Sequence, residues 1–403
     1  MNTIVRRRFS PAVFILVLAA VGLLGIIYYS PIWWVSLTAP NYPVEAFPDG
    51  VRIHFHMNGV FNGCKKVEKK EIRETEALDC VHEMDTINHY VGMYPIAAGG
   101  VIERAFSPFL ISLLGVMLLG FMIPNAAIRS GVMGLGFLVI LGWMSLFYFK
   151  TGGLEFHNQG YLAALVNALD QGAGDKVEEE QSSGQALIAR LKAELAKSEA
   201  KEQATKAMAE GKSEKERLID NLRVTFQKDQ ERKKSAISWT GSGAQMLGWH
   251  YEKSLARYFN NPAEITPMVA KMTLAANLAF AGLVLVMLFL LWGTRKTGGL
   301  VYWLLILVPI ALPAFFILDY AAWLWWYGHN LNDMGAFTVK AFMPTVLGDG
   351  KVAQFSTHSY PYMGFGFMLL NSTLLAVAAF IRRRELKERS LSPLQESGTT
   401  ATS

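Results

Sequence analysis

Histidine and methionine side chains occur together at two places in this chain of 403 residues. The stretch INHYVGM places His89 and Met93 four residues apart, and the stretch YGHNLNDM contains His329 and Met334. Residues four apart lie on the same face of a helix, so His89 and Met93 would point the same way. Imidazole and thioether groups together suit a soft ion such as Cu(I). The two stretches therefore raise the hypothesis of a copper site.

Three further histidines extend the set of candidate metal ligands. His54 and His56 lie two residues apart in VRIHFHM, whose alternating pattern predicts a strand, so they would share one face of it. His358 lies in QFSTHSYPYMG, near the end of the chain. None of these spacings is a strict metal signature. The alternative interpretation is that each histidine bonds to the backbone of a tight loop and each methionine fills a gap.

The two cysteines are candidates for a disulfide. Cys64 and Cys80 enclose 15 residues, and such a pair is typically oxidised outside the cytoplasm. Closing a loop of this length stabilises a fold by about 3 kcal/mol in the chain-entropy description. The alternative is a thiolate copper site to which His82 would contribute.

The elements that would position these residues are membrane-spanning helices. Hydrophobic residues make up 52% of the chain, which contains 24 Phe and 10 Trp. Six apolar runs approach the roughly 17–25 residues that cross a bilayer. They lie near 12–30, 107–124, 131–149, 272–292, 300–323 and 361–381. The sequence therefore predicts an all-α polytopic membrane protein with six transmembrane helices in contact with the lipid bilayer.

The positions of the basic residues predict the orientation of these spans. Arg6–Arg8, Arg129, Arg295–Lys296 and Arg382–Arg384 flank alternate ends, and the positive-inside rule places all four groups in the cytoplasm. Both termini are then cytoplasmic. No small-residue cleavage site follows the first apolar run, so 1–30 is interpreted as an uncleaved anchor. Much of the net charge of +5 follows from this topology, and it gives no indication of nucleic-acid binding.

Three segments then face outward, and all eight histidines and both cysteines fall in them. The outward segments are 31–106, 150–271 and 324–360, the paired spans occupy 107–149 and 272–323, and the last span, 361–381, leads to the tail 382–403. We expect the first segment to form a small compact domain and the polar tail to be disordered. Asp319, at the outer end of the fifth span, is the acidic residue placed closest to the membrane interior. It either takes part in a proton or ion path or caps its span.

The middle outward segment contains a predicted helical hairpin, 176–234, rich in Ala, Glu and Lys. Its apolar residues recur every four positions: Leu187, Leu191, Leu195 and then Leu218, Leu222, Phe226. Gly211 marks a break between two antiparallel helices. Because the apolar stripe is thin, we expect the hairpin to lean on an extracytoplasmic protein partner or, as in a coiled coil, on a second copy of the chain. A solvated spacer is the alternative.

Four stretches outside the predicted spans occur in an order that is informative. They are PIWWVSLTAPNYP (31–43), INHYVGM (87–93), YGHNLNDMGAFTVKAFMP (327–344) and QFSTHSYPYMG (354–364). Together they resemble a little-characterised family of small bacterial membrane proteins that occur in the company of copper-handling and nitrous-oxide-reductase maturation factors. The resemblance covers roughly 10–125 and 300–381. The short form of that family is four-spanning, whereas 126–299 here adds two spans and the hairpin.

The resemblance assigns residues to two motifs. The first motif contains Asn88, His89, Tyr90, Gly92 and Met93, and the second contains Gly328, His329 and Asn330. The Asp-Pro pair that follows GHNL in the family is replaced here by Asn332–Asp333. What the resemblance implies is a context of copper and respiratory-enzyme assembly in a bacterial inner membrane. Both motifs belong to outward segments, so His89, Met93 and His329 are expected to converge on one site.

Two functions are compatible with these features. The first is a copper-handling accessory protein, not an enzyme, that binds copper at the outer membrane face and assists maturation of an extracytoplasmic metalloenzyme. The second is a non-catalytic membrane scaffold, in which the two motifs pack as structural loops and the hairpin recruits the partner. A transporter is a weaker third option, supported by the six spans and Asp319. The sequence contains no Walker loop, dinucleotide fingerprint, nucleophile elbow or CxxCH haem motif.

Overall fold

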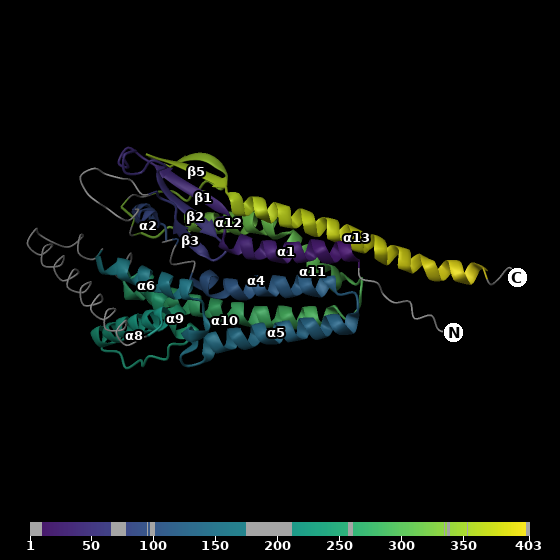
Figure 1. The fold of residues 1–403 in the computed structure, drawn as a ribbon. Helices are drawn as coiled ribbons and strands as arrows, with labels where there is room; N and C mark the ends of the chain where they lie inside the picture. The colour runs from purple at the N-terminus through teal and green to yellow at the C-terminus, as the bar shows by residue number, and fades with distance from the viewer. Residues whose placement is uncertain are drawn as a thin grey trace, which may run out of the picture.

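The computed structural model describes residues 10–65, 78–94, 96, 101–174, 212–256, 261–333, 335–336, 339–352 and 354–399. Its helices are α1 Pro11–Tyr29, α2 Cys80–Tyr90, α4 Val101–Met122, α5 Ala126–Phe149, α6 Gln159–Gly174, α8 Glu214–Lys233, α9 Gly243–Leu255, α10 Pro262–Gly293, α11 Leu300–Ile310, α12 Leu312–His329 and α13 Met363–Thr399, with the short 3-10 helix η1 Gly153–Phe156. Its strands are β1 Trp33–Thr38, β2 Val51–His56, β3 Gly59–Asn62, β4 Gly348–Val352 and β5 Phe355–Pro361. Figure 1 shows a bundle of long helices with the strands at one end. We call this end the sheet end and the opposite end the far end.

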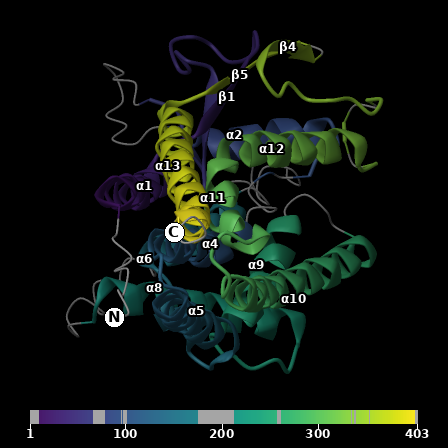
Figure 2. The same ribbon diagram turned by 90° about the vertical axis from the view of Figure 1, so that its right-hand side faces the viewer.

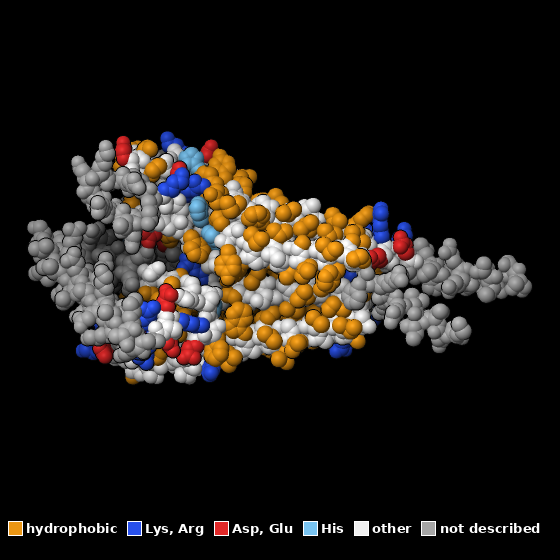
Figure 3. All heavy atoms as spheres, in the orientation of Figure 1, with side chains coloured by type: hydrophobic (Ala, Val, Ile, Leu, Met, Phe, Trp, Pro, Cys, Tyr) orange, Lys and Arg blue, Asp and Glu red, His pale blue; other side chains and the backbone are white. Residues whose placement is uncertain are grey.

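The long helices have the make-up of membrane spans. By length and composition, α1, α4, α5, α10 and the Met363–Glu388 part of α13 are each able to cross a membrane. Five of the six predicted spans correspond to these helices. On the face shown in Figure 3, hydrophobic side chains form a band across the middle of the molecule, with charged side chains gathered beyond both ends of the band. The chain is therefore a multi-pass membrane protein by its architecture.

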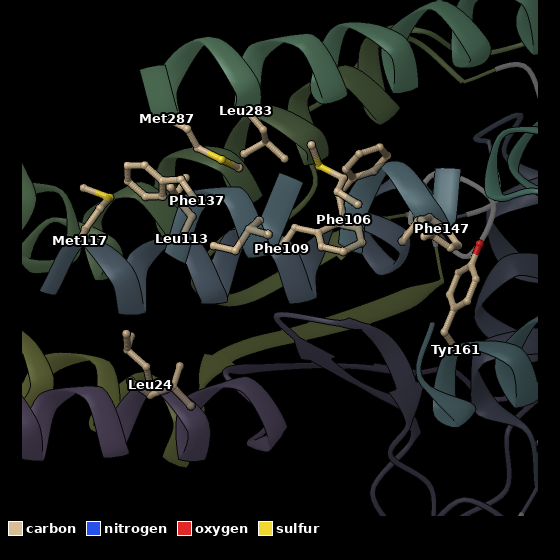
Figure 4. Packing of buried hydrophobic residues seen from close by; sticks show 14 of the residues in the cluster. Leu24, Phe106, Phe109, Leu113, Met117, Phe137, Phe147, Tyr161, Leu283 and Met287 are labelled. Carbon is tan, nitrogen blue, oxygen red and sulfur yellow. The ribbon is translucent and has the colours of Figure 1, made fainter. Parts of the chain in front are cut away.

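Close packing holds the helices of the bundle together. In Figure 4, Leu113 of α4 lies beside Phe137 of α5 within one buried cluster, and the Phe109 ring of α4 lies 6.0 Å from the Phe147 ring of α5. Lipid is as apolar as these side chains, so tight fit rather than escape from water drives such contacts. Gly136 of α5 contributes to this fit, because a Cβ atom at this position would lie 2.7 Å from Val116 of α4.

The predicted fifth span, 300–323, is not a straight helix. α11 ends at Ile310, and α12 starts at Leu312 with a bend of 66°. Pro313 has no amide hydrogen, so it cannot continue the helical hydrogen bonds across this point, and the hydroxyl of Ser372 donates to the Ile310 carbonyl at 2.8 Å. In Figure 2, which looks along the bundle, α12 lies crosswise to the long helices. The count of six spans holds only if α11 and α12 together make one crossing.

Two buried arginines close the far end of the bundle. Arg129 donates from Nε to the Thr294 carbonyl at 3.0 Å and from Nη1 to the Ile123 carbonyl at 3.1 Å. Arg382 donates from Nη2 to the Met122 carbonyl at 3.1 Å. The last carbonyls of a helix have no partner within it, and a positive charge there is favourable. The two guanidinium groups therefore complete the ends of α4 and α10.

A five-stranded antiparallel sheet, in the order β3-β2-β1-β5-β4, corrects the all-α prediction. The predicted strand at VRIHFHM is β2, but its partner β1 lies in the Trp-rich stretch after the first span, which resembles an aromatic membrane belt. One face of the sheet packs on α2, where Leu37 and Ile53 meet Met84 and Ile87. The sequence signal was obscured because the strands that pair with β1 come from opposite ends of the chain.

Helix α8 forms as predicted for the second half of the hairpin, but its apolar stripe is covered by the chain itself. Leu222 and Phe226 are 0% and 2% exposed, and the Phe226 ring lies 5.2 Å from the Trp249 ring of α9. Asp229 of α8 accepts hydrogen bonds from Trp249 at 2.9 Å and from Lys253 at 2.5 Å. The apolar stripe of α8 therefore packs against α9. The first half of the predicted hairpin lies in 175–211, outside the described residues.

Helix α13 continues beyond the last span to Thr399, where a disordered tail, 382–403, was predicted. The segment after Arg382 is rich in Glu, Lys, Arg and Leu, which are good helix formers. Arg382 and Glu385 form an ion pair of 3.1 Å one turn apart. The polar composition was interpreted as disorder, although it also suits a helix that extends from the bundle.

Candidate functional site

The first motif ends helix α2. The Gly92 amide donates to the His89 carbonyl at 2.9 Å, and the Met93 amide donates to the Asn88 carbonyl at 2.9 Å. Gly92 has φ +77°, a left-handed conformation that glycine adopts without strain. These are the two bonds of the Schellman motif that closes many helices. Asn88, Gly92 and Met93 in this motif thus have a structural explanation.

The second motif meets the first at Gly92. The backbone amide of Asn332 donates to the Gly92 carbonyl at 2.8 Å, and its side-chain Nδ2 donates to the same oxygen at 2.6 Å. The fit is close, because a Cβ atom on Gly92 would lie 2.5 Å from the Asn332 carbonyl oxygen, and one on Gly335 would lie 2.6 Å from the Gly92 nitrogen. Gly92 and Asn332 are 240 residues apart in sequence, and one backbone and one side-chain hydrogen bond hold the two motifs together there.

The end of α12 supports this junction. Gly328 is buried, its carbonyl accepts from the Phe342 amide at 3.1 Å, and a Cβ atom there would collide with the Phe342 carbonyl. Asn330 is exposed and donates from Nδ2 to the Trp326 carbonyl at 2.9 Å. The Trp326 ring lies 5.5 Å from the ring of Tyr94, which follows the first motif. Tyr90, the last residue of α2, is 48% exposed and takes no part in this packing core.

The predicted ligands at the junction differ in their surroundings. Met93 is buried at 5% exposure, and His89 is half-buried. His329 is exposed and stacks on Trp325 with ring centroids 4.5 Å apart. Its Nδ1 lies 2.8 Å from the Trp325 carbonyl. A carbonyl can only accept, so Nδ1 carries the proton and Nε2 presents its lone pair. Met334 lies outside the described residues.

The other three candidate histidines share one face of the sheet. His54 and His56 are on β2, and His358 is on β5, two strands away. Strands are about 4.8 Å apart, so the backbone of His358 lies roughly 10 Å or more from that of the β2 histidines, and the described residues form no group of three metal ligands there. His358 Nδ1 lies 2.6 Å from the Asp349 carboxylate on the neighbouring strand β4. As in His329, Nδ1 thus has an oxygen partner.

The environment keeps the β2 histidines neutral. Burial lowers the pKa of His54, with a further contribution from Arg52, and burial together with His54 lowers the pKa of His56 to about 4. His54 Nε2 is buried and has no hydrogen-bond partner among the described residues. Both imidazoles are consequently uncharged at neutral pH.

The cysteines are joined. Cys64 and Cys80 form a disulfide with their Cα atoms 5.9 Å apart, which ties the start of α2 to the strand β3 region. In this oxidised state neither sulfur is a thiolate, so the alternative copper site with His82 does not exist here. Across the described ranges, no three His, Cys, Asp or Glu side chains gather where they could hold a metal ion.

Glu103 is a residue that sequence reasoning missed. It lies in the first turn of α4, accepts a hydrogen bond from Trp323 of α12, and has Asp319 and Arg104 as electrostatic neighbours. Asp319 itself is exposed within α12 and caps no helix end. Asp319 is therefore not the sole acidic group near the apolar region. The stretch VIERAF directly before an apolar run was the signal that could have identified Glu103.

His157 is a buried histidine outside the predicted site. It is 2% exposed, its Nε2 lies 3.0 Å from the Ala105 carbonyl, and the rings of Phe147 and Tyr161 lie 4.6 and 4.1 Å away. Burial lowers its pKa to about 4. Its surroundings are those of a packed histidine that links α4 to the segment before α6.

The candidate site thus has two parts, both at the sheet end of the bundle. One is the junction of the two motifs around Gly92, with His89, Met93 and His329 beside it. The other is the sheet face that carries His54 and His358. No protein-family model, curated protein or solved structure matches this chain.

Proposed function

We propose that the protein is a non-catalytic assembly subunit, anchored in a bacterial inner membrane with both termini in the cytoplasm. The observation that supports this best is the double hydrogen bond from Asn332 to the Gly92 carbonyl. It uses the two motifs to fix the end of α2, and with it the sheet, onto α12 of the bundle. A platform fixed in this way suits the task of holding a partner in a set orientation above the membrane.

The partner would bind beside the helices α6, α8 and α9. These helices pack on each other. In the sequence, the segment 175–211 connects α6 to α8, and it has the Ala, Glu and Lys composition predicted for a docking arm. Because the apolar side of α8 is already covered, the docking function would fall to 175–211 alone.

The experiment removes that segment. Residues 175–211 are replaced by a Gly/Ser linker in the tagged full-length chain, which is then purified from its own membranes under mild detergent. We expect the partner to be lost while the thermal unfolding temperature stays unchanged. As a matched control, Arg223→Gln on the exposed side of α8 should retain the partner. Retention of the complex after removal of 175–211 would contradict the proposal.

A second candidate function, copper handling at the outer membrane face, is favoured by the orientation of two histidines. His329 and His358 each have Nδ1 bonded to an oxygen, with Nε2 left to bind a ligand. Metal-binding histidines usually have this arrangement, in which a carbonyl or carboxylate orients the ring. On this proposal, His89 and Met93 of the first motif would complete a Cu(I) site with His329.

Copper content tests this second function. The detergent-purified protein is loaded with Cu(I), desalted and analysed for metal, beside the His89→Ala/His329→Ala double variant. Copper handling predicts about one ion per chain in the wild type and none in the variant. The assembly role predicts that the variant still binds its partner. Equal copper content in both proteins would show that His89 and His329 are not copper ligands.

A further inference from the structure

The sheet face that points away from α2 carries a continuous group of rings with one guanidinium group. Side chains alternate across a sheet, so cross-strand neighbours share a face. Trp34 of β1 is paired with His54 of β2 and with Tyr360 of β5, and His54 is paired with Phe61 of β3. We call the surface formed by Trp34, Arg52, His54, His56, Phe61, Tyr360 and Tyr362 the aromatic face.

The rings of the aromatic face contact one another. Trp34 and Tyr360 have centroids 5.4 Å apart, and His54 stacks on Tyr362 at 5.2 Å. The Arg52 guanidinium lies 4.1 Å from the centroid of the Trp34 ring. Phe61 is 41% exposed, and the other rings are half-buried. The face is thus preformed and open on its outer side.

Chain connectivity fixes the height of this face relative to the membrane. Helix α1 has 19 residues and is about 28 Å long, close to the thickness of a hydrocarbon core. Only Ser30, Pro31 and Ile32 separate it from β1, and Tyr362 directly precedes α13. Trp34 is five residues from the end of α1 and Tyr360 is three from the start of α13, so their backbones lie within about 16 and 10 Å of these helix ends. In Figure 3, histidine and basic side chains border the band at the sheet end of this view.

Basic side chains lie on the β2 side of the aromatic face. Arg52 lies 3.8 Å from the Asp49 carboxylate, but Asp49 is held more closely by Lys65, at 2.7 Å. On the β5 side, Asp349 accepts a hydrogen bond from Tyr360 and lies 2.6 Å from His358 Nδ1, so the free positive charge of the face is that of Arg52 on the β2 side. His54 and His56 add hydrogen-bonding nitrogens without charge. Trp and Tyr beside a basic residue at a membrane boundary suit the level of lipid headgroups, where basic residues attract anionic lipids.

We propose that the aromatic face binds the headgroup of an anionic phospholipid in the leaflet next to the sheet. The Arg52 guanidinium would contact the phosphate, and the Trp34 and Tyr360 rings would lie at the glycerol level. This role is independent of the partner and copper proposals, because it uses neither 175–211 nor the motif junction. It assigns the sheet a task that the two motifs do not explain.

The test is a lipid titration followed by native mass spectrometry of the detergent-purified full-length protein. Phosphatidylglycerol and phosphatidylcholine with identical acyl chains are compared for the wild type, Arg52→Gln and the control Arg223→Gln. A basic residue near a membrane surface changes affinity for an anionic lipid about fivefold. We expect Arg52→Gln to weaken phosphatidylglycerol binding by about this factor, with phosphatidylcholine unchanged and Arg223→Gln like the wild type. The proposal would be overturned if the wild type bound both lipids equally, or if Arg52→Gln bound phosphatidylglycerol as tightly as the wild type does.

Two further arms cover a misfolded variant and a different ligand. If Arg52→Gln does not fold, Arg52→Lys is used instead; it keeps the charge and should retain the selectivity for phosphatidylglycerol. In the wild type, raising the salt concentration should weaken the binding of phosphatidylglycerol but not that of phosphatidylcholine. Selectivity that is insensitive to salt would overturn the proposal. Soluble glycerol phosphate should not compete at the concentration at which the lipid binds. Effective competition would show a site for a free anion instead of a lipid.

Discussion

Gly92 is constrained by its own backbone and by a neighbour. Its φ of +77° is unfavourable for a residue with a Cβ atom, and that atom would lie 2.5 Å from the Asn332 carbonyl oxygen. We expect Gly92→Ala to lower the free energy of unfolding by about 1–3 kcal/mol. Thermal unfolding in detergent measures this change. Gly282→Ala in α10, where a Cβ atom meets nothing within 4 Å, is the matched control and should leave stability equal or higher.

His157 makes stability depend on pH. Its pKa is lowered by burial to about 4, below the ordinary value of 6.5, so the unfolded chain binds a proton that the folded chain does not. The contribution of the neutral imidazole is complete above pH 6.5 and is lost as the pH falls toward 4, by at most about 3 kcal/mol. His157→Gln should reduce the difference in unfolding temperature between pH 7 and pH 4.5. His329→Gln, at an exposed site, serves as control, and an equal pH response in the His157→Gln protein would contradict this assignment.

At the residue scale, the structure gives the first motif a role that the sequence did not suggest. The spacing of His89 and Met93 was interpreted as ligand chemistry, whereas the Schellman bonds explain Asn88, Gly92 and Met93 as a helix end. Their meeting with the second motif was expected, but the contact is made by Asn332, a position at which the chain departs from the family pattern. Glu103 was missed because its hydrogen-bond partner Trp323 is 220 residues away, and only the folded structure brings the two side chains together.

At the element scale, the disulfide ties α2 to the sheet. Cys80 is the first residue of α2 and is fully buried, and Cys64 follows β3. We expect the Cys64→Ser/Cys80→Ser variant to lose about 3 kcal/mol of stability, since the unfolded chain is no longer restricted by the closed loop. Hydrogen exchange should show the loss first in α2. A reducing agent should lower the stability of the wild type by the same amount and leave the double variant unaffected; a further loss in that variant would indicate another cause.

Elements with a local pattern were predictable, and those defined by distant partners were not. The apolar runs of α1, α4, α5, α10 and α13 and the alternation in β2 are visible in the sequence alone. Strand β1 pairs with β5, more than 300 residues later, so its Trp33 and Trp34 have no local signal that separates a strand from a membrane belt. For α8, the apolar stripe was seen correctly, but its cover by Trp249 of α9 depends on tertiary packing.

At the scale of the whole molecule, the two ends of the bundle are expected on opposite sides of the membrane. Basic side chains close the far end, where Arg129 and Arg382 bind helix carbonyls. The positive-inside rule places this end in the cytoplasm. A membrane-impermeant maleimide applied to spheroplasts should label Lys351→Cys on β4 and leave Lys296→Cys unlabelled until the membrane is opened. The wild type, whose cysteines are bonded, should not react, and the reverse pattern would invert the topology.

The bend between α11 and α12 has a mechanical consequence. With 11 and 18 residues, the two helices are about 16 and 27 Å long, and a bend of 66° leaves about 11 Å of the second along the axis of the first. Their combined reach of about 28 Å just matches a bilayer of about 30 Å. A change of 10° in the bend would alter that reach by about 4 Å. If α11 and α12 make one crossing, a thinner bilayer can be matched at this single joint, next to Ser372 and below the platform that α12 supports, whereas a straight span must tilt as a whole.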